Sequence, residues 1–257
     1  MEVEDYITAL SREGSLLGDA AEEAGLTAPV PTCPGWQVRD LLRHQLFVHD
    51  WAGRHVREQA PEVLGDPGEA AILAGGPPDG ELLAAYRAGL AELVTTLRAA
   101  DPAVQCAAFM PATSPLAFWA RRQAHETAIH RLDAQSATRP QDPVEAFAAD
   151  FAADGIDELI MGFAARRRYR MRTDDKRSLT VATTDTGARW LISAADGHTT
   201  VSRDPAGSAT AGCALDGPAS GLYAFLWNRA AREPARVTVT GDQDVIDSWR
   251  HDVRVSW

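Results

Sequence analysis

The feature that most constrains the fold is a change in the spacing of apolar residues near residue 140. Before it, apolar side chains recur every three or four residues, as they do on one face of a helix. This spacing predicts four helices, at about 2–24, 37–58, 81–100 and 118–133. The stretch 61–79 is rich in proline and glycine and is predicted to be a loop. The sequence therefore predicts a four-helix bundle over residues 1–138.

The second part of the chain follows a proline-containing break at 138–143. Apolar and polar residues alternate there over short stretches, which is typical of half-buried strands. Strands are predicted at 179–184, 188–193, 199–202 and 236–240, and helices at about 144–168, 217–231 and 244–254. We therefore expect residues 143–257 to form a smaller α+β domain.

Composition excludes several classes of protein. The net charge of −11 argues against a general affinity for nucleic acid or anionic membranes. The apolar runs are too short to span a bilayer, and the acidic start M-E-V-E-D-Y differs from a signal peptide. Three widely spaced cysteines fit a reducing compartment. We expect a cytoplasmic protein that binds neither nucleic acid nor membrane, and the sequence carries no signal of an oligomeric state.

The helix predicted at 118–133 carries residues typical of a metal site. Glu126 and His130 are four residues apart, so they lie on one face, one turn apart. Asp133 follows three residues after His130 and can hold its second ring nitrogen. Arg122 precedes Glu126 by one turn, and it could hold a substrate carboxylate or pair with Glu126. Because two ligands do not make a site, a third must come from elsewhere.

His44 is the best candidate for a third ligand, because it lies among the inward-facing residues in the middle of its helix. His55 lies on the same face but about 16 Å further along the helix axis. It is also near the helix end, where we expect exposure to solvent. The remaining histidines are expected to point elsewhere or to lie at the surface: His49, His125, His198 and His251.

Other residues have less specific signals. Cys33 could be a nucleophile, but a small residue that fixes a proline-rich turn is the favoured interpretation. Arg87 could hold a carboxylate, and an ion pair within the bundle is the alternative. Tryptophans are expected to form the core and pocket walls: Trp36, Trp51 and Trp119.

Two long motifs connect these candidates. Residues 31–44 read P-T-C-P-G-W-x-V-R-D-L-L-x-H, and residues 118–133 read F-W-A-R-R-x-A-H-E-T-A-x-H-R-x-D. Together they resemble the mycothiol-dependent maleylpyruvate isomerase family of the DinB-like metalloenzyme superfamily. The resemblance implies a DinB-like four-helix bundle followed by an α+β domain similar to sterol carrier proteins. It also implies that His44, Glu126 and His130 hold a divalent metal, usually zinc.

Two imidazoles and one carboxylate leave an open position, which is typical of a catalytic rather than a structural site. Zinc suits these ligands, and nickel or iron would also fit. The resemblance implies that mycothiol is the thiol cosubstrate and attacks a small electrophile as a thiolate. The result would be isomerisation of an activated double bond, or transfer to give a mycothiol conjugate. Two alternatives stay open: a zinc hydrolase that needs no thiol, and a small-molecule or lipid binding module without catalysis.

Overall fold

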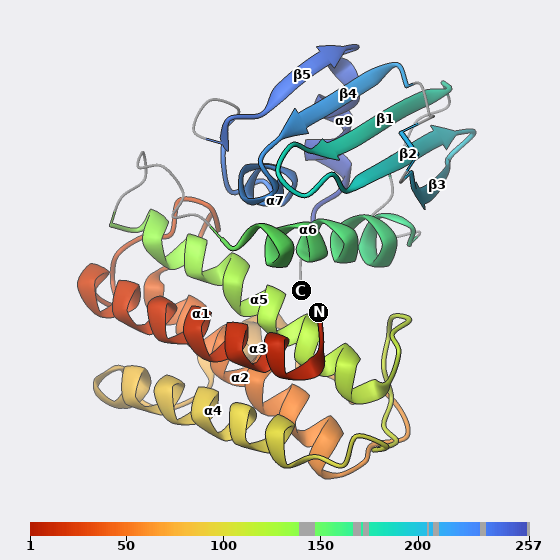
Figure 1. Cartoon of the computed structure of the whole chain (residues 1–257). Helices are drawn as coiled ribbons and strands as arrows, with labels where there is room; N and C mark the ends of the chain where they lie inside the picture. The colour runs from red at the N-terminus through yellow and green to blue at the C-terminus, as the bar shows by residue number, and fades with distance from the viewer. Residues whose placement is uncertain are drawn as a thin grey trace. The chain divides into compact units, whose positions relative to one another are not determined.

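The computed structural model describes residues 1–138, 147–166, 171, 175–204, 206–207, 211–231 and 235–255 (Figure 1). The chain divides into two compact units, Met1–Gln141 and Asp142–Ser256.

The first unit is a four-helix bundle, and this prediction is confirmed (Figure 1). Its long helices are α1 (Val3–Ala24), α2 (Val38–Arg57), α4 (Asp79–Ala99) and α5 (Pro115–Ser136). Helices α1 and α2 each pack against both α4 and α5, so the four helices enclose one core. The buried apolar side chains of this core include Leu17, Leu41, Leu42, Leu82 and Tyr86.

The segment 61–79 is not an uninterrupted loop, so that prediction was wrong. It contains a short helix, α3 (Glu69–Ala74). The indole nitrogen of Trp36 donates a hydrogen bond to the carboxylate of Glu69 at 2.9 Å, and Ile72 is buried. Six residues are too few to show a helical period, and these tertiary contacts are invisible in the sequence.

Local contacts explain where α5 begins and how closely α1 and α4 pack. The hydroxyl of Ser114 caps α5 by accepting a hydrogen bond from the backbone N–H of Ala117 at 3.1 Å. Gly14 lies inside α1, and a Cβ at this position would be 2.5 Å from a methyl carbon of Leu90. The glycine therefore permits a close helix contact, and the Tyr86 hydroxyl donates to the Gly14 carbonyl at 2.9 Å.

Helix α5 is buried almost throughout, although many of its residues are polar. Arg131 is only 1% exposed, and its guanidinium pairs with the buried carboxylate of Glu13 on α1. A buried charge is tolerated when it is paired in this way. The polar surface of α5 is thus turned into the interior of the bundle.

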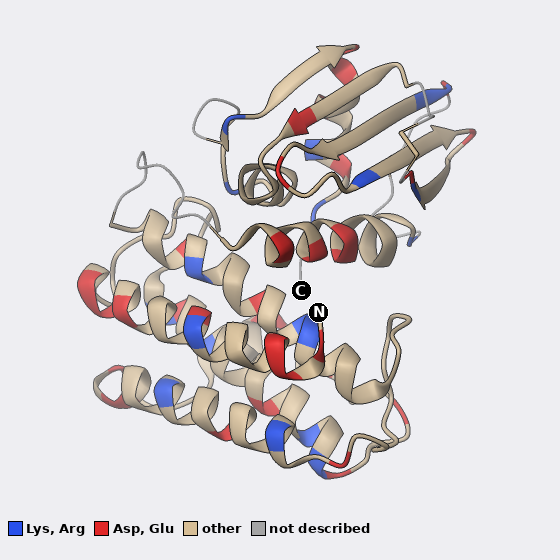
Figure 2. Cartoon of the chain, in the orientation of Figure 1, with Lys and Arg blue, Asp and Glu red and all other residues tan. Residues whose placement is uncertain are grey.

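The outer faces of α1 and α4 carry charges of both signs (Figure 2). Arg87 on α4 pairs with Asp19 and Glu22 on α1, at 3.1 and 2.7 Å. Arg98 pairs with Glu4 at 2.9 Å. Arg87 therefore forms ion pairs within the bundle, which was the alternative to holding a substrate carboxylate.

The second unit is an α+β domain with a mixed sheet of five strands, and this prediction is also confirmed (Figure 1). The strands are β1 (Arg177–Thr183), β2 (Arg189–Ala195), β3 (His198–Arg203), β4 (Cys213–Gly217) and β5 (Thr238–Gly241). Their order is β3-β2-β1-β4-β5, with β1 and β4 parallel and the other neighbours antiparallel. The prediction missed β4, a five-residue strand that contains Asp216 and ends at a glycine.

The helices of this unit lie between and after the strands. Helix α6 (Ala149–Asp157) continues into a π-helical segment, η1 (Glu158–Ala164). Helix α7 (Ala219–Leu226) packs against α6 and β4, and α9 (Asp244–Asp252) packs against β1. Both ends of the helix predicted at 144–168 lie outside the described residues. Among the helices that the structure does describe, none is long and apolar enough for a membrane span.

Candidate metal centre

Helices α2 and α5 bring His44, Glu126 and His130 together inside the first unit. One potential ligand atom from each side chain lies within 4.8 Å of the other two. Oε1 of Glu126 is 3.1 Å from Nε2 of His44 and 3.2 Å from Nε2 of His130. All three residues are buried. The fold therefore brings the side chains of the three predicted ligands close together.

His130 is held in position from its other side. Its Nδ1 is 2.8 Å from Oδ2 of Asp133, as the spacing predicted. The second carboxylate oxygen of Asp133 accepts a hydrogen bond from the hydroxyl of Thr32. With Nδ1 engaged in this way, Nε2 of His130 faces Glu126.

Arg122 pairs with Glu126, which is one of the two roles that the sequence suggested for it. Its guanidinium donates to Oε2 of Glu126 at 3.1 Å, and the residue is 1% exposed. The two oxygens of Glu126 thus have separate partners: Oε2 faces Arg122, and Oε1 faces the two imidazoles.

The surroundings of Glu126 keep its carboxylate ionised. Burial alone would raise the pKa of Glu126. Hydrogen bonds from His130 and His44, together with the charge of Arg122, outweigh burial and hold this pKa well below its ordinary value.

The two imidazoles differ in their affinity for protons. Burial lowers the pKa of His44, which favours the neutral ring that a metal requires. Burial would lower the pKa of His130 too, but hydrogen bonds with Asp133, Cys33 and Glu126 raise it well above its ordinary value. A cation that binds here would therefore compete with a proton on His130.

The donor set fits a divalent cation. Two imidazole nitrogens and one carboxylate oxygen come from two helices and converge on one buried place. The carboxylate oxygen that faces both Nε2 atoms supplies the negative charge that a cation would neutralise.

Two residues of the turn before α2 approach this cluster, and the sequence analysis missed their positions. Cys33, His130 and Asp133 form a second group of possible ligand atoms within 4.8 Å of one another. The ring of Trp36 stacks on that of His130, with centroids 6.3 Å apart and planes at 15°, and it is 5.2 Å from the ring of His44. The only signal in the sequence is that this turn directly precedes the helix of His44.

Cys33 also helps to fix the turn before α2, which was the favoured interpretation of this residue. Its backbone N–H donates to the carbonyl of Val30, and its carbonyl accepts from the N–H of Trp36, both at 3.0 Å. His130 is distant from Cys33 in the sequence, but the fold brings their possible ligand atoms within 4.8 Å of each other.

His55 is separated from the cluster, but the expectation that it is exposed was wrong. It is 0% exposed. Its Nδ1 is 2.7 Å from the carbonyl of Trp51, and its Nε2 accepts from the backbone N–H of Leu64 at 3.0 Å. The chain that follows α2 therefore folds back over His55 and gives it a structural role.

The other histidines lie away from the cluster, as expected. His49 is buried with its Nε2 3.0 Å from the hydroxyl of Thr127. His125 has an edge-to-face contact with the ring of Tyr6 on α1. The exposed histidines are His198 and His251.

The fold and the clustered side chains together define the class of protein. A four-helix bundle that gathers His, Glu and His from two helices is followed by a small α+β domain. Sequence models described as "Mycothiol maleylpyruvate isomerase N-terminal domain" and "MDMPI C-terminal domain" match residues 7–135 and 150–248. The chain belongs to the mycothiol maleylpyruvate isomerase family, and this places it among enzymes.

Solved structures agree with this assignment at the level of the fold. The crystal structure of the mycothiol-dependent maleylpyruvate isomerase superposes on this chain with a TM-score of 0.65. The match covers 93% of each chain at 12% sequence identity. A histidine-to-alanine mutant of that enzyme has a TM-score of 0.64 with the same identity and coverage. The comparison with curated protein sequences gave no match.

Proposed function

We propose that His44, Glu126 and His130 hold a divalent metal ion, zinc foremost, and that the chain uses it with mycothiol to act on a small electrophile. The observation that carries this proposal is the convergence of three ligand atoms within 4.8 Å in a chain of this family. Three protein ligands leave a position open, as catalytic zinc sites do. Nickel or iron would also suit the ligands.

The neighbouring residues would position this set. Asp133 orients the ring of His130, and Arg122 holds one oxygen of Glu126 so that the other faces the imidazoles. Trp36 covers the two histidine rings. When bound, the cation would supply the Lewis acidity that makes a thiol nucleophilic at neutral pH.

We assign this chemistry to the domain of residues 1–138, and residues 143–257 to a separate sterol-carrier-like domain. The sulfur of mycothiol would add to the activated double bond of a substrate such as maleylpyruvate, which the names of the solved relatives contain. Rotation about the resulting single bond and elimination of the same thiol would give the trans isomer, with no net change in atoms. On an electrophile that carries a leaving group, displacement would give a mycothiol conjugate instead.

Metal analysis of the purified protein tests the site itself. We expect about one metal ion per chain in the wild type and none in the triple variant His44→Ala, Glu126→Ala, His130→Ala. The matched control is His198→Ala, because this histidine is exposed and outside the cluster. A wild type that stays metal-free in metal-supplemented medium would contradict the proposal, as would a triple variant with full metal content.

Turnover assays test the use of the thiol. We expect the metal-loaded protein to isomerise maleylpyruvate only when mycothiol is present. The reducing conditions of a cytoplasm would keep this thiol in its free form. Incubation with mycothiol and a panel of electrophiles, followed by mass spectrometry, would detect conjugates and so distinguish transfer from isomerisation. Hydrolytic turnover without any thiol would contradict the proposal and support a zinc hydrolase.

A further inference from the structure

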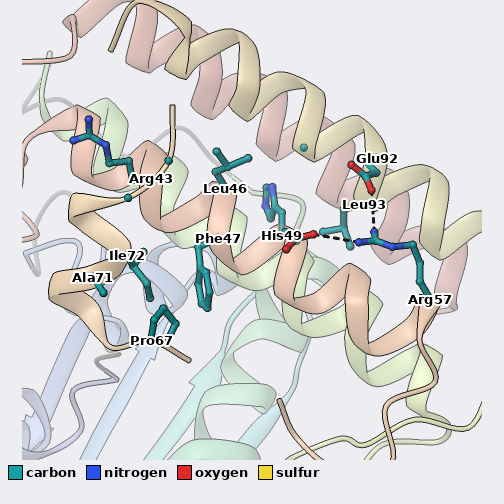
Figure 3. Close-up of a pocket in the computed structure, with 14 residues that line it drawn as sticks. Arg43, Leu46, Phe47, His49, Arg57, Pro67, Ala71, Ile72, Glu92 and Leu93 are labelled. Carbon is teal, nitrogen blue, oxygen red and sulfur yellow. Dashed lines mark hydrogen bonds and ion pairs between the residues drawn. The ribbon is translucent and has the colours of Figure 1, made fainter. Parts of the chain in front are cut away.

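The first unit contains a cavity of about 440 Å³ between α2, α3 and α4 (Figure 3). Its apolar lining includes Leu46 and Phe47 of α2, Ile72 of α3 and Leu93 of α4. This volume is in the range of cavities that bind small organic molecules. The three proposed metal ligands are not among its lining residues, so it is distinct from the metal centre.

His49 adds one polar group to this lining. Figure 3 places it between Leu46 and Phe47 on one side and Leu93 on the other. It is 1% exposed, and burial lowers its pKa to about 3, so its ring is neutral. Its Nε2 pairs with Thr127, whereas its buried Nδ1 has no hydrogen-bond partner in the part of the chain that the structure describes. A buried polar atom without a hydrogen-bond partner is unfavourable, and a ligand hydroxyl that pairs with it would remove this penalty.

The charged side chains around the cavity are already paired. Arg57 lies 3.1 Å from both Asp50 and Glu92, as the dashed lines of Figure 3 show. Arg43 pairs with Asp79 at 2.9 Å. Because both guanidinium groups have carboxylate partners, the cavity offers no unpaired positive charge to an anionic ligand.

We propose that this cavity binds a small uncharged aromatic alcohol of the phenol class, with its ring against Phe47 and Leu93 and its hydroxyl on Nδ1 of His49. A neutral imidazole nitrogen accepts or donates according to its tautomer, and a phenolic hydroxyl can serve either form. An aromatic ring suits a lining that includes Phe47, because aromatic pairs add to the effect of buried area. This inference does not depend on the proposed function.

Calorimetric titration of the full-length protein with 2-naphthol and 2-methylnaphthalene tests the inference, because the two differ by a hydroxyl in place of a methyl group. We expect saturable binding of 2-naphthol at one site, about tenfold tighter than that of 2-methylnaphthalene. His49→Leu should abolish this preference. Ala71→Phe should weaken the binding of 2-naphthol at least about tenfold, because exposed Ala71 lines the cavity and a phenyl ring would fill it.

Three results would overturn the inference: no saturable binding of 2-naphthol, equal affinity for the two compounds, or unchanged affinity in Ala71→Phe. Tighter binding of naphthalene-2-sulfonate than of 2-naphthol would overturn the inference that the ligand is uncharged. The comparison of the two compounds on the wild type decides the question even if His49→Leu fails to fold.

Discussion

Acid should weaken the first unit through one buried histidine, His49. Burial lowers the pKa of His49 from 6.5 to about 3. As the pH falls through about 6.5, the unfolded chain takes up a proton at this position, whereas the folded chain does so only near pH 3. The contribution of His49 to the free energy of unfolding is therefore complete above pH 6.5 and is lost progressively as the pH falls toward 3.

The size of this loss follows from the two pKa values. Between pH 7 and pH 5 the free energy of unfolding should fall by about 2 kcal/mol through His49, and between pH 7 and pH 3 by about 4 kcal/mol. The variant His49→Leu lacks this contribution. His44 and His130, whose pKa values are also shifted, remain in both proteins, so their effects largely cancel in the comparison.

Urea unfolding followed by circular dichroism at 222 nm, with a chelator present throughout, measures the difference. From pH 7 to pH 5 the wild type should lose about 2 kcal/mol more than His49→Leu. The control His198→Ala should follow the wild type, because His198 is exposed. Equal losses in the wild type and His49→Leu would refute the reasoning, since His49 would then bind protons equally well in the folded and unfolded chains.

Three further predictions concern contacts in both units. Asp133→Asn removes the carboxylate that holds His130, so metal affinity in a competitive chelator titration should fall by about tenfold to a hundredfold; unchanged affinity would contradict the role of Asp133. Arg131→Met leaves Glu13 charged and buried, and should lower the free energy of unfolding by about 3–5 kcal/mol, with most of the loss recovered when Glu13→Leu is added. A stability equal to that of the wild type would show that the pair contributes nothing. Gly221→Ala should destabilise the second unit by at least about 2 kcal/mol in thermal unfolding, because the new Cβ would lie 1.8 Å from a backbone carbonyl oxygen, and a neutral result would require that backbone to move freely.

The part of the candidate site that lies on one helix could be predicted from the sequence. Helix geometry fixes the positions of residues three and four apart, so Glu126, His130 and Asp133 were placed correctly relative to one another. His44 could be ranked above the other histidines by its inward position at mid-helix. Its approach to Glu126 from another helix needed the family resemblance as well.

Contacts between distant segments could not be predicted in this way. Thr32 and Asp133 are 101 residues apart, and no periodicity relates the turn before α2 to the face of α5. His55 was expected to be exposed because it is near a helix end, but the backbone of Leu64 and the ring of Trp119 cover it. Strand β4 was missed because it is short, and because its pairing with β1 is set by the sheet rather than by its own pattern.

The distribution of the polar cluster over α2 and α5 has a consequence for the order in which the protein assembles during synthesis. His44 and Glu126 are 82 residues apart, and the last helix of the bundle supplies two of the three side chains. A growing chain that ends after α4 holds one of the three and can form no such cluster. Small zinc modules fold around their ion, whereas here the bundle would have to be nearly complete before a cation could meet these three side chains. The metal would therefore arrive late, at a scaffold whose shape the helices have already determined.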